Sequence, residues 1–260
     1  MTAANQPRDT LSAAIRAAVA QGRPAVVGFM TAGFPDRAGF AASLRAIATE
    51  ADVVEIGVPF SDPMADGATI QRASFASLLG GFTLPWLLEE LQAVQPRPQA
   101  PVLLMSYLNP LLASGLGKLP EAALRAGVSG FIIPDLPYEE SADMRAALDR
   151  VGIALVQMVT PVTPAPRLKL LSEASQGFVY AVTMTGTTGK SVAVPDEVLG
   201  YMDRVKAVSP VPVCAGFGIR TAEQVARMRG HVDGVVVGSA LVEVLERGED
   251  PAAFLKSLKS

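Results

Sequence analysis

The chain has 260 residues, half of them apolar and 18% charged, so it can bury a large core and is not an intrinsically disordered protein. Its 22 basic and 25 acidic residues give a net charge of −3 without any basic block, which argues against binding to nucleic acid or to an anionic membrane. A single cysteine, Cys214, excludes an internal disulfide, and together with the single histidine, His231, it excludes a typical zinc site.

The sequence also lacks the marks of a membrane or secreted protein. Its most apolar stretches are broken by glycine, proline or a charge well short of the ~18 residues that a membrane span needs. The N-terminal segment carries Asp9 and small residues at helical spacing, unlike a secretory signal. We therefore expect a cytoplasmic protein that holds no metal.

In chain order, an opening helix is predicted around Leu11, Ile15 and Val19. Eight short runs rich in Val, Ile and Leu then recur about every 30 residues, which is the size of a strand–helix unit. The runs are continuously apolar, as expected for parallel strands that are covered on both faces. They begin near Val26, Val53, Val102, Phe131, Ile153, Phe178, Val211 and Val235.

Helical patterns separate these runs, for example Phe40, Leu44 and Ile47 after the first one. The second and third runs, starting at Val53 and Val102, are far enough apart for a loop and two helices. No linker or change in composition divides the chain. The sequence therefore predicts one α/β domain over residues 1–260, a single (β/α)8 TIM barrel with an extra N-terminal helix and an additional helix between strands 2 and 3.

Active sites of such barrels lie at the carboxyl ends of the strands, and Glu55 is the first candidate. It lies inside the second apolar run, between Val54 and Ile56. If Glu55 points into the barrel mouth, burial raises its pKa toward the range that suits an acid–base catalyst. The alternative is an outward Glu55 paired with a basic residue on a covering helix, and the sequence leaves both open.

Two loops carry further carboxylates at the same rim. The loop GVPFSDPMADG contains Asp62 and Asp66, which make it a candidate catalytic lid, although its Pro, Gly and Asp content also suits an ordinary turn. Asp135 ends the fourth run and is either a third rim carboxylate or a cap of the following helix.

The seventh and eighth runs end in glycine-rich segments. AGFGIR supplies Gly216 and Gly218, and VVVGSA supplies Gly238 and Ser239 at the start of a helix. Glycine lets backbone N–H groups approach an anion, and a helix N-terminus favours negative charge. Because the loops after strands 7 and 8 form the phosphate site of many barrels, these residues predict a phosphorylated substrate.

Five segments together resemble the tryptophan synthase α subunit family in order and spacing, across nearly the whole chain; they are VEIGVPFSDPMADG, SYLNP, FIIPDLPYEES, FVYAVTMTGTTG and AGFGI. The resemblance implies retro-aldol cleavage of indole-3-glycerol phosphate to indole and glyceraldehyde 3-phosphate. It also implies that indole passes to a pyridoxal-phosphate-dependent β subunit in an α2β2 assembly, and that this chain itself has no cofactor.

The same resemblance implies roles for individual residues. Glu55 matches the acid–base glutamate of the family, Asp66 the aspartate that accepts the indole N–H, and Tyr180 the tyrosine of the sixth strand. Phosphate binding is implied for Gly189, Gly218, Gly238 and Ser239. An indole pocket with loop closure is implied for Phe29, Leu104, Ile132, Thr188 and Phe217, and the interface with the β subunit for Asp62 and Asp135.

Three alternatives stay open at the level of sequence. A free-standing indole-3-glycerol phosphate lyase carries the same motifs, and a module that only activates a partner is a second reading. The third is another phosphate-binding barrel aldolase that uses Lys190 as a Schiff-base lysine. The TGKS string that contains Lys190 does not form a P-loop, because Met184 stands where that motif needs glycine.

Overall fold

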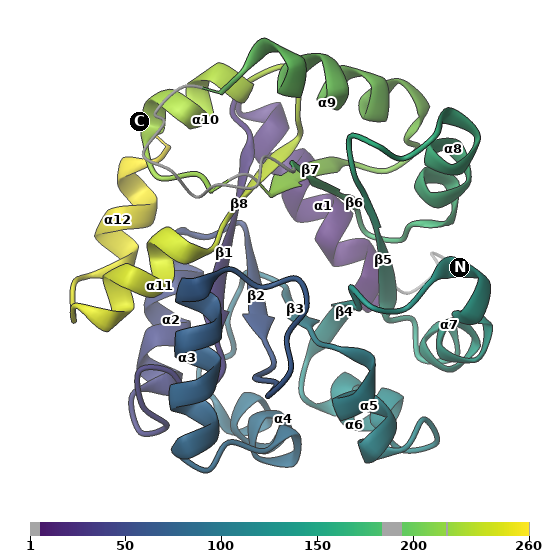
Figure 1. The fold of residues 1–260 in the computed structure, drawn as a ribbon. Helices are drawn as coiled ribbons and strands as arrows, with labels where there is room; N and C mark the ends of the chain where they lie inside the picture. Colours follow the sequence, from purple (N-terminus) through teal and green to yellow (C-terminus); the bar gives the residue numbers. More distant parts are fainter. Residues whose placement is uncertain (1–5, 184–193, 217, 260) are drawn as a thin grey trace, which may run out of the picture.

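Eight parallel strands hydrogen-bond in chain order and close into a barrel (Figure 1). The computed structural model describes residues 6–183, 194–216 and 218–259. The strands are β1 (Ala25–Thr31), β2 (Val53–Gly57), β3 (Val102–Met105), β4 (Val128–Ile132), β5 (Ala154–Val159), β6 (Val179–Val182), β7 (Val213–Gly216) and β8 (Gly234–Val237). The predicted (β/α)8 barrel is thereby confirmed.

Helices follow the strands in chain order around the outside of the barrel, except for α1, which precedes β1 and lies at one end of the barrel. They are α1 (Pro7–Ala20), α2 (Phe40–Glu50), α3 (Ala68–Leu79), α4 (Leu84–Ala93), α5 (Leu108–Ser114), α6 (Leu119–Arg125), the 3-10 turn η1 (Tyr138–Glu140), α7 (Ala142–Asp149), α8 (Ala165–Ala174), α9 (Asp196–Val208), α10 (Ala222–Met228), α11 (Ser239–Glu246) and α12 (Pro251–Ser257). Within the described ranges, no helix combines the length and apolar content needed to cross a membrane.

The strands are apolar on both faces because each packs in two directions. Side chains that face the interior form one buried cluster, which includes Val27, Val53, Leu103, Ile132, Val156, Phe178, Cys214 and Val236. Their chain neighbours face the helices in a second cluster, which includes Val26, Val54, Leu104, Phe131, Leu155, Val179, Val213 and Val235. This alternation decides which polar residues enter the barrel.

The predicted opening helix, α1, packs against one end of the barrel interior (Figure 1). Leu11 and Ile15 are fully buried in the interior cluster. A methyl group added at Gly130 would lie 2.8 Å from the Leu11 side chain, so this glycine makes room for the helix. The predicted third member of the apolar stripe, Val19, is instead 42% exposed, and Ala18 packs inward in its place.

Two helices, α3 and α4, fill the long connection between β2 and β3, as predicted. The Thr83 hydroxyl accepts a hydrogen bond from the backbone N–H of Trp86 and so caps α4. The connection from β3 to β4 also holds two helices, α5 and α6, which the sequence reading did not separate. Gly115 divides them, because its φ of 78° is a left-handed conformation that ends a helix.

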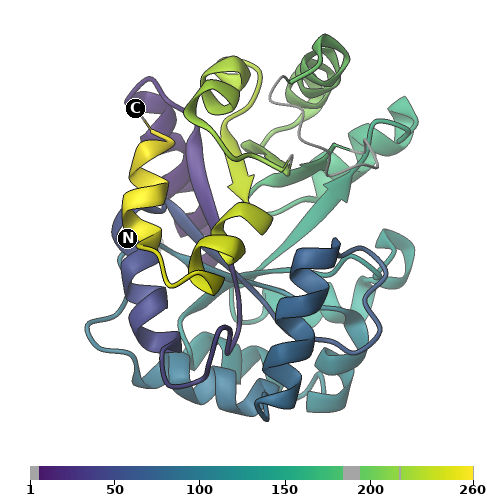
Figure 2. The same cartoon turned by 60° about the vertical axis from the view of Figure 1, so that its left-hand side comes forward.

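Helix α3 lies beside α11, so the loop after β2 and the loop after β8 are joined through their helices (Figure 2). The Arg72 guanidinium on α3 pairs with the Glu246 carboxylate on α11 at 2.8 Å. The Thr69 hydroxyl at the start of α3 also contacts the Glu243 carboxylate. Both pairs are partly exposed, so they contribute more to the alignment of the two helices than to stability.

Candidate active site

Glu55 lies on the inner face of β2, next to Phe29 of β1 and Leu103 of β3. It is fully buried, and neither of its carboxyl oxygens has a hydrogen-bond partner among the described residues. Burial raises the pKa of Glu55 to about 8, with a further contribution from the charge of Asp66. The inward prediction is therefore confirmed, and the outward ion pair is wrong. At neutral pH Glu55 is mainly a protonated acid that faces the barrel mouth.

Asp66 lies in the loop between β2 and α3 and is half-buried. Burial raises its pKa above 3.8, and an interaction with the Tyr107 hydroxyl opposes that rise. The charge of Asp66 also raises the pKa of Glu55 and of Tyr180. The charge of Asp66 therefore acts on one residue of β2 and on one of β6, which places all three in the same region of the barrel. Two carboxyl groups with different environments face the same space, which is the arrangement that acid–base chemistry requires.

Two aromatic rings lie across the barrel mouth, and a glycine makes room for each. A methyl group at Gly57 would lie 2.5 Å from the ring of Phe29, and one at Gly216 would lie 2.6 Å from the ring of Tyr180. Burial raises the pKa of Tyr180 well above 10, with the charge of Glu55 as the next contribution. The Tyr180 hydroxyl is therefore a neutral group whose ionisation the charges of Glu55 and Asp66 oppose.

Replacement of Gly216 by alanine should force the Tyr180 ring out of its place. We expect Gly216→Ala to lower the free energy of unfolding by about 1–3 kcal/mol, the usual cost of overpacking, when measured by urea denaturation. Gly117→Ala is the matched control, because a methyl group there meets nothing within 4 Å. Equal stability of the two variants would show that the Tyr180 ring is not confined by Gly216.

The ends of β7 and β8 lie next to this mouth, and each leads into a glycine with open backbone, meaning that no other atoms lie where a side chain would begin. Gly218 has a φ of 46° and is exposed, and Gly238 precedes the first turn of α11. A methyl group at either position would meet nothing within 4 Å, so space lies in front of both. The first N–H groups of α11 have no partner within the helix and favour an anion. Ser239 is the first residue of that helix.

The metal-ligating and nucleophilic side chains of the described residues are arranged differently from a metal or thiol catalytic site. Groups of three or more His, Cys, Asp or Glu side chains that could hold a metal ion are absent from it. Cys214 is fully buried in the barrel interior, and burial raises the pKa of its thiol well above 9. The His231 ring pairs with the Asp203 carboxylate at 2.8 Å and is partly exposed.

Comparison with known proteins identifies the family. A model of the tryptophan synthase alpha chain matches residues 15–259. The tryptophan synthase alpha chain of Desulfovibrio desulfuricans is 44% identical over 248 residues, which cover 94% of this chain and 97% of that protein. The chain belongs to the tryptophan synthase alpha chain family. The alpha chain of Geobacter sulfurreducens is 42% identical and covers 91% of this chain and 92% of its own.

Solved structures of tryptophan synthase chains share the barrel. One chain from Mycobacterium tuberculosis tryptophan synthase superposes with a TM-score of 0.88 at 35% identity, over 96% of both chains. The tryptophan synthase alpha chain of Legionella pneumophila gives a TM-score of 0.85 at 29% identity, over 96% of this chain and 95% of that one. The fold is therefore that of tryptophan synthase TIM barrels.

The residues expected to form the indole pocket differ in where they lie in the structure. Phe29 and Ile132 are buried at inward positions. The expectation for Leu104 is wrong, because it packs outward against the helix layer, and its neighbours Leu103 and Met105 face the interior. Strand side chains alternate, so an error of one position reverses the face. Three expected residues, Thr188, Gly189 and Phe217, lie outside the described residues, as does Lys190.

The two expected interface residues differ in their surroundings. Asp62 is exposed and accepts a hydrogen bond from the hydroxyl of Ser61. Asp135 is half-buried and accepts a hydrogen bond from the backbone N–H of Leu108, at 2.8 Å. Asp135 therefore caps α5, the helix after β3, rather than the helix after its own strand.

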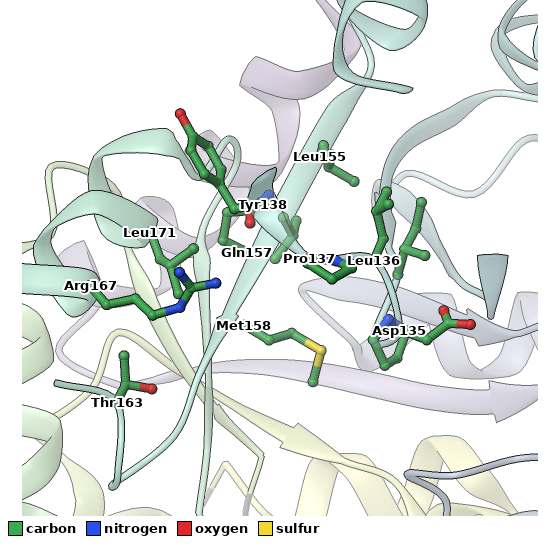
Figure 3. A pocket seen from close by; sticks show the side chains of 13 residues that line it. Asp135, Leu136, Pro137, Tyr138, Leu155, Gln157, Met158, Thr163, Arg167 and Leu171 are labelled. Carbon is green, nitrogen blue, oxygen red and sulfur yellow. The ribbon is translucent and has the colours of Figure 1, made fainter. Parts of the chain in front are cut away.

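A cavity of about 340 Å³ lies beside Asp135, between the ends of β4 and β5 and helix α8 (Figure 3). Gln157 of β5 and Arg167 of α8 line it, and Arg167 forms an ion pair with Glu139 at 2.6 Å. Glu55, Asp66 and Tyr180 do not line this cavity. The cavity is therefore distinct from the group formed by these three side chains.

Tyr107 is a functional candidate that the sequence indicates only as an aromatic residue near the rim, suited either to barrel packing or to a flat aromatic substrate. Its hydroxyl accepts a hydrogen bond from the backbone N–H of Ala65, directly before Asp66, at 2.9 Å. The available signal was its position immediately after the third strand, in the SYLNP segment. A carboxyl-end position alone selects many residues, and only the folded loop shows which of them meets Asp66.

Proposed function

We propose that this chain cleaves indole-3-glycerol phosphate to indole and glyceraldehyde 3-phosphate, as expected for a tryptophan synthase alpha chain. It is then a carbon–carbon lyase of tryptophan biosynthesis. The observation that carries the proposal is Glu55, which is fully buried, has no hydrogen-bond partner among the described residues, and has a pKa raised to about 8 by burial and by Asp66. The open backbone at Gly218 and Gly238 supports a phosphate site at the same rim.

The reaction breaks the bond between C3 of the indole ring and C3′ of the glycerol chain. An indolyl carbanion is a poor leaving group, so C3 must gain a proton as this bond breaks. Glu55 is protonated at neutral pH and supplies that proton. The electron pair of the broken bond returns to the ring and restores the neutral indole.

Asp66 stabilises the protonated ring before the bond breaks. Protonation at C3 places positive charge on the ring nitrogen, and the Asp66 carboxylate accepts the hydrogen bond of that N–H. The C3′ hydroxyl loses its proton to become the aldehyde of glyceraldehyde 3-phosphate. Once Glu55 has given up its own proton, its carboxylate is the base closest to the reacting carbons. One proton enters and one leaves, so the reaction is balanced.

The residues that we assign to substrate binding lie at or after the carboxyl ends of the strands. Gly218, Gly238 and Ser239, together with Gly189, bind the phosphate through backbone N–H groups and the N-terminus of α11. Phe29, Ile132 and the interior side chain of Met105 line the space for the indole ring. Thr188 and Phe217 complete closure over the substrate.

The partner is a tryptophan synthase β subunit, and we assign to it the pyridoxal phosphate, so this chain works without a cofactor. Asp62 and Asp135 lie in loops of one rim, which is the surface we assign to the β subunit in an α2β2 assembly. The whole chain acts as a single domain, and the compartment is the cytoplasm.

The first test measures indole released from indole-3-glycerol phosphate by the purified chain, with and without a β subunit. We expect slow release by the chain alone and faster release with the partner. Release that the β subunit does not change would favour a free-standing lyase. A folded chain that releases no indole in either condition would overturn the proposal, and borohydride trapping with substrate would then test Lys190 as a Schiff-base residue.

A further inference from the structure

Tyr107 connects the end of β3 to the loop that carries Asp66. Its side chain is only 4% exposed, and its ring lies 5.2 Å from the ring of Phe60 at the start of that loop. The Tyr107 hydroxyl accepts a hydrogen bond from the backbone N–H of Ala65 at 2.9 Å. One side chain therefore holds the loop both by ring packing and by a hydrogen bond next to Asp66.

The same hydroxyl has a proton left to donate. A phenol accepts through oxygen and donates through its single O–H. The Tyr107 hydroxyl accepts from Ala65, and its interaction with the Asp66 carboxylate lowers the pKa of Asp66. Because the hydroxyl oxygen already accepts from Ala65, its O–H is left to donate toward the neighbouring Asp66 carboxylate, and such a hydrogen bond favours the ionised form.

The backbone at Tyr107 is itself fixed from the neighbouring loops. The N–H of Leu108 donates to Asp135 at 2.8 Å, and the N–H of Ser106 donates to the carbonyl of Ile132 at 3.0 Å. The Ser106 hydroxyl donates to the Tyr107 carbonyl at 2.9 Å. The backbone around Tyr107 is therefore anchored by hydrogen bonds at the ends of β3 and β4.

We propose that Tyr107 is a positioning residue for Asp66, whose hydroxyl holds the loop and orients the Asp66 carboxylate toward the ring nitrogen of the substrate. The inference rests on the proposed function and deepens it. Tyr107 takes no part in bond breaking. It acts through Asp66: within the described residues, the Gln71 amide holds only the backbone carbonyl of Asp66, at 2.8 Å, so the orientation of the carboxylate is left to the Tyr107 hydroxyl.

The charged and titratable groups that face Asp66 come from three elements. They are Glu55 of β2, Tyr180 of β6 and Tyr107 before α5. Glu55 and Tyr180 are acids whose pKa values the charge of Asp66 raises, so neither stabilises that charge. Within the described part of the chain, Tyr107 is the group that favours the ionised form of Asp66.

The test is Tyr107→Phe, which keeps the ring beside Phe60 and removes the hydroxyl. We expect kcat for indole release to fall about ten- to a hundred-fold, as for a lost hydrogen bond to a charged group, with KM changed much less. Loss of the donor raises the pKa of Asp66, so the acid limb of the pH–kcat/KM profile should move to higher pH.

A direct readout is the titration of Asp66 by ¹³C NMR of aspartate carboxyl groups, with its signal assigned by its absence in Asp66→Asn. Tyr107→Phe should raise the observed pKa of Asp66. Tyr138→Phe is the matched control: Tyr138 lies in the next loop, where its ring packs against Arg145, and we expect no change in either readout.

An Asp66 titration identical in Tyr107→Phe and the unaltered protein would overturn the inference, even if activity fell. A fall in kcat without any movement of the acid limb would do the same, since it would indicate a general structural role. If the unaltered chain releases no indole, the proposed function fails. The NMR titration still reports whether Tyr107 controls Asp66.

Discussion

Glu55→Gln is expected to reduce indole release from indole-3-glycerol phosphate by about 10²- to 10⁴-fold, the range that a positioned acid–base group contributes. Glutamine matches the size of glutamate but cannot transfer the proton to C3. The measurement is kcat/KM of the isolated chain. Glu173→Gln on the exposed face of α8 is the control, because it removes only a weak ion pair with Lys169.

Although Glu55→Gln should lose activity, it should gain stability at alkaline pH. The pKa of Glu55 is about 8 in the folded chain, against 4.5 for an ordinary glutamate. The folded state therefore binds this proton more tightly, so the free energy of unfolding falls as pH rises from 4.5 to 8. Glutamine has no such dependence. We expect Glu55→Gln to be more stable than the unaltered chain at pH 8, by on the order of a few kcal/mol, and equal to it below pH 4.5.

Urea denaturation at both pH values checks this pair of results. Loss of activity with a gain in stability is the signature of a buried functional carboxyl group. Normal turnover by Glu55→Gln would refute the mechanism. A loss of stability at pH 8 would instead indicate that Glu55 has a stabilising partner in the folded chain.

Asp66→Asn is expected to reduce indole release by about 10²- to 10³-fold, the usual effect of removing one group that stabilises charge in the transition state. Asparagine keeps the shape of the side chain but has no negative charge to oppose the charge on the ring nitrogen. The loss should appear mainly in kcat, because that charge develops only as C3 is protonated.

A second effect of Asp66→Asn separates it from simple damage to the loop. The charge of Asp66 raises the pKa of Glu55, so its removal should lower the Glu55 pKa and move the alkaline limb of the pH–rate profile to lower pH. Asp143→Asn on the exposed face of α7 is the control and should change neither kcat nor the alkaline limb of the pH–rate profile. An unchanged alkaline limb in Asp66→Asn would show that the two carboxyls do not interact.

Much of the barrel could be predicted because its signal is repetitive. Eight apolar runs at a steady spacing identify parallel strands covered on both faces, and the gap after the second run shows the two helices. The predicted starts of some strands differ from the observed ones: β4 begins at Val128 rather than Phe131, and β7 begins at Val213 rather than Val211. Pairing with neighbouring strands decides these limits, and periodicity within one segment does not contain that information.

Glu55 could be found in the sequence because a lone carboxylate in an apolar strand is rare and costly unless it has a use. Leu104 could not be assigned in the same way. Every residue of β3 is apolar, so the sequence does not show which of Leu103, Leu104 and Met105 faces the interior. The register of β3 with β2 and β4 decides it, and places Leu104 against the helices.

The sequence by itself determined the fold class, the family and the residue types of the reaction, because these depend on local patterns and long motifs. Only the tertiary structure decided that Glu55 faces inward, with no partner in the described part of the chain, that Asp135 caps α5 and that Tyr107 meets the loop of Asp66. These contacts join residues from different strand ends. Closure of the barrel brings those ends together, and no segment of the chain carries that geometry alone.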